Sequence, residues 1–143
     1  MTQAQNDPPV LVKEVTQAQI ERYARVSGDL NPIHLDPGYA ATTPFGRTIA
    51  HGMLVVGFIS ELMTRRFGRS WLESGQLRVR FKGPAYPGDR LTIAAVVRER
   101  VSLGAQERVG FGVSCRNQGN GEIVVGEASL VLSRESHQEH HDD

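Results

Sequence analysis

The sequence predicts an α+β fold in which an antiparallel sheet wraps around one long helix. Residues 51–67 are apolar on nearly every side at their start, which is typical of a helix buried on most sides, and Gly57 in the middle indicates a close neighbour. From Gly75 onward the apolar residues instead alternate with polar ones, which is the period of a strand. A buried helix followed by several strands defines the predicted architecture.

The first third of the chain predicts a short strand, a helix and a turn-rich segment. Residues 1–9 carry no apolar period and are expected to form a flexible leader, whereas residues 10–15 suit a short strand. Thr16 and Gln19 have the spacing of a helix start, and Gly28 is a typical helix stop. A second, shorter helix is expected over residues 38–42, with Asp36 as its N-cap.

Four strands are predicted in the second half of the chain. They cover about residues 76–82, 91–101, 109–115 and 122–132. A type II turn at residues 86–89 and a hairpin loop at residues 117–121 separate them. Gly126 and Ala128 in the last strand predict that a helix lies close to it, and the polar residues 136–143 are expected to be a disordered tail. Residues 10–135 are therefore expected to form a single domain.

The composition narrows the classes of function. The 143 residues include 16 Lys and Arg against 16 Asp and Glu, so no excess charge points to nucleic acid or to an anionic membrane. The one cysteine, Cys115, excludes an intramolecular disulfide and a cysteine-based zinc site, which suits a reducing cytoplasm. Neither a signal peptide nor an apolar run of membrane-spanning length is visible. We expect a cytoplasmic protein.

The candidate chemistry lies in the segment from residue 26 to residue 53. Asp29 follows a helix stop, and His34 lies between two proline-containing turns, so both are expected on a rigid non-helical segment where they can converge. Gly52 lies at the start of the long helix, where unpaired N–H groups favour a developing negative charge. An Asp and a His at this spacing are weak evidence when taken alone, because such residues are also common in turns.

The residues around this pair resemble the hydratase motif of the MaoC-like, (R)-specific enoyl-CoA hydratases. They read SGDLNPIHLDPGYA at 27–40 and RTIAHGM at 47–53, and a later block, VRFKGPAYPGD at 79–89, is also similar to that family. The resemblance covers about residues 11–133. It implies a hot-dog fold, a homodimer whose sheets join edge to edge, and a substrate that is an acyl thioester of coenzyme A or acyl carrier protein.

The resemblance also implies a reaction and a set of roles. Water would add to a trans-2-enoyl thioester on one face to give a (3R)-3-hydroxyacyl thioester, or would be lost in the reverse direction. Asp29 and His34 would bind the water and handle its proton, with the choice of acid and base left open. The Gly52 N–H would receive the oxyanion, and Asn31 would orient the loop. No cofactor and no metal are expected.

Two other functions remain open at this stage. A hot-dog acyl-CoA thioesterase would direct water at the thioester carbonyl, and a non-catalytic or heterodimeric dehydratase subunit would only bind acyl thioesters. For His51 we expect a structural role in shaping the helix start. Met53, Phe58 and Met63 are expected in the core, with Met53 also a candidate for lining an acyl tunnel, and Cys115 is expected to be a buried, inert thiol.

Overall fold

Five antiparallel strands form one sheet in the computed structural model, which describes residues 10–133. The strands are β1 (Val10–Glu14), β2 (Gln76–Phe81), β3 (Arg90–Leu103), β4 (Gln106–Arg116) and β5 (Glu122–Ser133), in the order β1-β3-β4-β5-β2. All four predicted strands of the second half are therefore present, with β3 and β4 extending a few residues further than expected. The predicted leader and the predicted tail lie outside the described residues.

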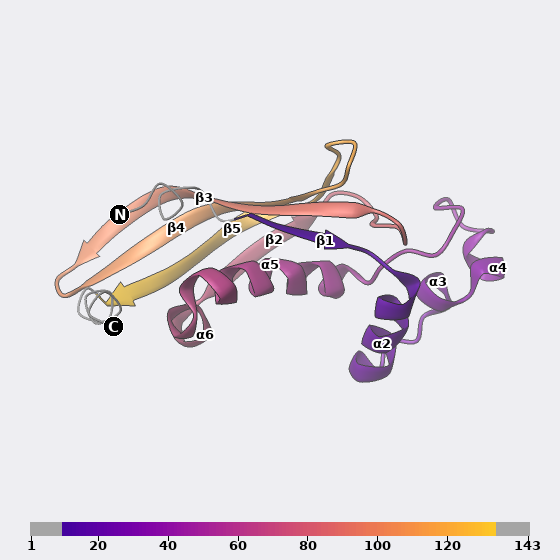
Figure 1. Ribbon diagram of the computed structural model, residues 1–143, viewed down its shortest axis with the longest axis horizontal. Helices are drawn as coiled ribbons and strands as arrows, with labels where there is room; N and C mark the ends of the chain where they lie inside the picture. The colour runs from indigo at the N-terminus through magenta and orange to yellow at the C-terminus, as the bar shows by residue number, and fades with distance from the viewer. Residues whose placement is uncertain (1–9, 134–143) are drawn as a thin grey trace.

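The long helix α5 (Gly52–Phe67) lies along one face of this sheet (Figure 1). The helix buries Val55, Phe58, Ile59, Leu62 and Met63, and the alternating apolar residues of β3, β4 and β5 complete the core. Burial of this apolar surface is the main force that holds the helix against the sheet. The α+β architecture predicted from the sequence is thus confirmed.

The outward side of α5 differs from the prediction. Met53 is 60% exposed rather than part of the core, and a Cβ built on Gly57 would meet no atom within 4 Å. The expectation of burial on most sides is wrong for the described chain because the sheet covers the helix from one side only. An exposed apolar side on a long helix needs a covering surface from elsewhere.

A short helix that the sequence did not reveal, α6 (Arg69–Ser74), fixes the far end of α5. Its buried Trp71 donates a hydrogen bond from Nε1 to Ser60 Oγ at 3.0 Å, and Ser74 Oγ accepts one from the Val131 N–H of β5 at 2.9 Å. A helix, α6, thus lies close to β5 as predicted, although the nearest neighbour of Gly126 itself is β2, since an added Cβ would lie 2.0 Å from the Arg78 carbonyl oxygen.

Three helices gather beside the start of α5, at the right of Figure 1: α2 (Gln17–Ser27), α3 (Pro32–Leu35) and α4 (Pro37–Ala40). Helix α2 begins and ends as predicted, since Thr16 Oγ1 accepts from the Gln19 N–H and Gly28 has a φ of 81°. Asp36 caps α4, as expected, although the helix spans Pro37–Ala40 rather than residues 38–42.

The predicted turn at residues 86–89 is present, with a φ of 96° at Gly88. Among residues 10–133, no helix is long and apolar enough to cross a membrane.

Candidate active site

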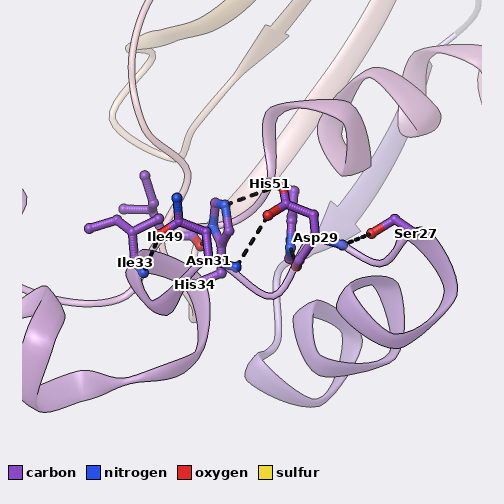
Figure 2. A network of polar contacts seen from close by, with 7 residues as sticks. All are labelled: Ser27, Asp29, Asn31, Ile33, His34, Ile49 and His51. Carbon is purple, nitrogen blue, oxygen red and sulfur yellow. Dashed lines mark hydrogen bonds and ion pairs between the residues drawn. The ribbon is translucent and has the colours of Figure 1, made fainter.

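Asp29 is held by the turn that follows helix α2. Its N–H donates to Ser27 Oγ at 3.2 Å, and its Oδ1 accepts from the Asn31 N–H at 3.2 Å (Figure 2). Such an Asx turn uses one carboxylate oxygen and fixes the side chain relative to its own backbone. The other oxygen, Oδ2, is left to face His34, and the side chain is 53% exposed.

His34 lies on the one-turn helix α3, and this corrects the expectation of a non-helical segment. Pro32 occupies the first turn of α3, where its missing N–H does no harm, and Asn31 Oδ1 caps the helix by accepting from the Ile33 N–H at 3.0 Å. Asn31 therefore caps α3, and its side-chain oxygen is already engaged. The His34 carbonyl in turn accepts from Gln17 Nε2 at 2.9 Å.

The buried ring of His34 has a defined tautomer. Its Nδ1 lies 2.7 Å from the Ile49 carbonyl oxygen, and because a carbonyl can only accept, Nδ1 carries the proton. In the neutral ring the lone pair is then on Nε2. Burial lowers the pKa of His34 below its ordinary value of 6.5, and the Ile49 carbonyl and Asp29 carboxylate oppose this shift only in part. His34 is therefore neutral at physiological pH.

Asp29 and His34 converge as the sequence predicted. Their facing atoms, Asp29 Oδ2 and His34 Nε2, are 4.0 Å apart, which is too far for a direct hydrogen bond. One water molecule at about 2.8 Å from each atom fits this separation. The arrangement presents two hydrogen-bond acceptors to the same small polar molecule.

His51 is a site residue whose contacts the sequence analysis did not anticipate. It is 2% exposed, its Nε2–H donates to the Asp29 carbonyl oxygen at 3.0 Å, and its ring stacks on His34 with centroids 3.8 Å apart. Tyr23 packs on His51 at 4.8 Å. The only local signal in the sequence was a histidine immediately before the glycine that starts the long helix.

Gly52 is the first residue of α5, so its N–H has no acceptor within the helix. It opens onto a cleft of about 450 Å³, which Ile49, Phe81 and Lys82 also line. Asp29 and His34 are not among the residues that line this cleft. Gly52 is nevertheless close to the pair in the chain, because it directly follows His51.

Asp29, His34 and His51 are the one group in the described chain whose nitrogen and oxygen atoms, all within 4.8 Å of one another, suggest a metal site. The two histidine rings are stacked with only 23° between their planes. Ring lone pairs lie in the ring plane, so the lone pairs of two stacked rings do not converge on one ion. The arrangement suits the binding of water better than the binding of a metal.

Comparison with known proteins identifies the family of this chain. The family model described as "MaoC like domain" matches residues 2–115. The chain is 41% identical over 126 residues to an (R)-specific enoyl-CoA hydratase of Aeromonas caviae, covering 85% of this chain and 90% of that protein. It is 31% identical over 122 residues to a 3-hydroxybutyryl-CoA dehydratase of Methylorubrum extorquens, covering 85% and 75%. A solved structure, described as the (R)-hydratase from A. caviae involved in PHA biosynthesis, matches with a TM-score of 0.77 and 30% identity over 87% of this chain and 92% of that one.

Proposed function

The chain belongs to the MaoC-like domain family, and we propose that it is an (R)-specific enoyl-thioester hydratase. It adds water to a trans-2-enoyl thioester to give a (3R)-3-hydroxyacyl thioester, and it catalyses the reverse dehydration. The observation that carries the proposal is the pair of acceptor atoms, Asp29 Oδ2 and His34 Nε2, held 4.0 Å apart. Water is a weak nucleophile, and such a pair can bind it and take its proton.

His34 is the proton acceptor in this scheme. Its Nε2 carries the lone pair, because Nδ1–H is committed to the Ile49 carbonyl. As the water oxygen bonds to C3, one of its protons passes to Nε2. The Asp29 carboxylate orients the other proton of the water and stabilises the imidazolium that forms. The Nε2–H then returns the proton to C2 on the same face, so that one water molecule supplies both groups and the addition is syn.

Gly52 stabilises the charge that this attack creates. When C3 is attacked, the electron pair moves through C2 to the thioester oxygen, which becomes an enolate oxyanion. The Gly52 N–H at the N-terminus of α5 has no acceptor within the helix and donates to this oxygen, and the helix dipole adds to the effect. A single donor of this kind is worth about 2.7–4 kcal/mol of the barrier. Asn31 acts through helix α3, which it caps and which carries His34.

The acyl thioester is the partner of this site, and the names of both relatives specify coenzyme A thioesters. Crotonyl-CoA is therefore the substrate to test. Hydration removes the enoyl absorbance without releasing a thiol, whereas a thioesterase would release free thiol. Thiol release without hydration would refute the proposal. Activity that appears only after a second hot-dog subunit with its own acid and base is added would instead identify a heterodimeric dehydratase.

We also propose that the enzyme is a cytoplasmic homodimer of hot-dog subunits. The outward side of α5, with Met53 60% exposed and open space beside Gly57, needs a covering surface. Among residues 10–133 the edge strand β2 pairs only with β5, and its Phe81 is 57% exposed. A second copy joined at this edge covers these features. Light scattering that gives the mass of a monomer would contradict the assembly. The single Cys115, buried and free, is suited to a reducing compartment.

A further inference from the structure

We infer that His51 is a positioning residue. It fixes the positions of Asp29 and His34 relative to each other and to the Gly52 N–H. The inference rests on the proposed function, because it concerns the same pair. It replaces the expectation that His51 merely shapes the start of α5. His51 in fact makes no side-chain hydrogen bond that would cap the helix.

His51 ties the Asp29 loop to the rest of the fold. The other hydrogen bonds of Asp29 in the described chain go to Ser27 and Asn31, which belong to the same short loop. Such local bonds shape the loop without fixing its place in the molecule. The bond from His51 Nε2–H to the Asp29 carbonyl oxygen, at 3.0 Å, spans 22 residues of sequence and supplies that link.

The same ring restrains His34. The two imidazoles stack with centroids 3.8 Å apart and 23° between their planes, while the Ile49 carbonyl holds His34 Nδ1–H at 2.7 Å. Both restraints come from residues 49–51, so this short segment fixes the direction in which His34 Nε2 points. Gly52 follows directly and starts the buried helix. Residues 49–52 thus position the proton acceptor His34, the Asp29 carboxylate and the Gly52 oxyanion donor relative to one another.

A buried atom without a partner supports a functional reason for the imidazole. Because Nε2 donates to Asp29, the lone pair of His51 lies on Nδ1, and this buried atom has no hydrogen-bond partner among the described residues. Burying an unpaired acceptor destabilises the folded protein. A phenyl ring would stack on His34 without that cost. What a phenyl ring lacks is the donor to Asp29, and this is the feature that the imidazole provides.

Three substitutions separate the two contacts. His51→Phe keeps a ring against His34 and loses the donor, His51→Gln keeps an N–H donor and loses the ring, and His51→Ala loses both. A misplacement of about 1 Å at a catalytic group can cost about 10²-fold in rate. We therefore expect His51→Ala to lower kcat by about 10²-fold, with the Phe and Gln variants each recovering part of the loss and KM changing by less than about threefold.

A matched control is available at the other end of α5. Trp71→Phe removes one partly buried hydrogen bond, from Nε1 of Trp71 on α6 to Ser60 Oγ on α5. It should lower the melting temperature and leave kcat of the folded enzyme unchanged. The positioning role is wrong if the activity lost by the His51 variants is fully explained by a smaller fraction of folded protein. It is also wrong if KM rises while kcat stays unchanged.

A second measurement keeps the inference independent of the proposed reaction. NMR of the His34 side chain should show one ring orientation in the wild-type protein and more than one in His51→Gln, whose stacking restraint is gone, while the Ile49 carbonyl keeps the proton on Nδ1 in both. A single, wild-type orientation of the His34 ring in a folded His51→Gln protein would overturn the restraint on His34. Wild-type protein that fails to hydrate crotonyl-CoA but gives the expected spectra would refute the proposed function and leave the positioning geometry standing.

Discussion

Replacing Gly52 by proline isolates the proposed oxyanion donor with little disturbance of the fold. Gly52 is the first residue of α5, a position that proline favours because its N–H has no partner within the helix. The preceding residue, His51, has φ −61° and ψ 136°, an extended conformation that a following proline prefers. Gly52→Pro therefore deletes the N–H and preserves the helix start.

The expected magnitude follows from the donor and from one steric contact. Loss of an oxyanion donor costs about 10²–10³ in kcat. Any side chain at this position also meets Phe81, since an added Cβ would lie 2.6 Å from its Cε1. Phe81 is 57% exposed in the single chain but lies at the edge that the proposed dimer covers, so the steric contact is tested directly in a Phe81→Ala background. Gly52→Ala introduces the same Cβ and keeps the N–H, which makes it the matched control.

The assay is crotonyl-CoA hydration by the two variants, each made in the wild-type and the Phe81→Ala background. Phe81→Ala removes the steric contact, so the remaining difference between Pro and Ala reports the N–H alone. We expect Gly52→Pro to turn over about 10²–10³ times more slowly than Gly52→Ala in both backgrounds, at equal folded fraction. Equal kcat values for Pro and Ala would refute the assignment of Gly52 as the oxyanion donor.

Three further predictions follow from the same structure. Asp29→Asn and His34→Ala should each lower the rate of crotonyl-CoA hydration by at least about 10²-fold, while the circular dichroism spectrum and melting temperature stay close to wild type. Wild-type turnover in either variant would contradict the assigned roles. Because the pKa of His34 is lowered in the folded protein, kcat/KM should reach half its maximum below pH 6.5, and an activity midpoint above pH 6.5 would contradict this. For the same reason, the stability that His34 contributes should be complete above pH 6.5 and should be lost as pH falls through the lowered pKa. Burial raises the pKa of Cys115 to about 12, so a thiol reagent should modify it only after unfolding, and rapid reaction with the native protein would be inconsistent with its burial.

The regular elements with strong local signals were predictable from the sequence. Period-2 alternation identified the strands, and Thr16 and Gly28 marked both ends of α2. Helix α6 was not foreseen because its six residues are too few for a helical period, and it is held by tertiary contacts of Trp71 and Ser74. The exposure of Gly57 was also unpredictable, since an apolar pattern shows that a helix side is to be covered without showing what covers it.

In the site, too, features set by neighbouring residues were predictable, and contacts between residues far apart in the sequence were not. Turn chemistry predicted that Asp29 and His34 converge, because the turns that carry them are formed by residues within a few positions. The contacts of His51 join residues 17 and 22 positions apart, to His34 and Asp29, and no local pattern reports such separations. Similarly, the tautomer of His34 depends on the Ile49 carbonyl, 15 residues away.

The start of α5 is where the stability of the fold and the geometry of the site meet. Val55 and Ile59 bury the first turns of the helix against the sheet, and this burial fixes the axial position of Gly52. The residues just before Gly52 hold His34 and Asp29. A movement of the helix along its axis would therefore displace the oxyanion donor and the water-binding pair together, preserving their mutual arrangement. Changes within residues 49–52 would alter that arrangement, which is why this segment belongs to the active site together with the carboxylate and the imidazole.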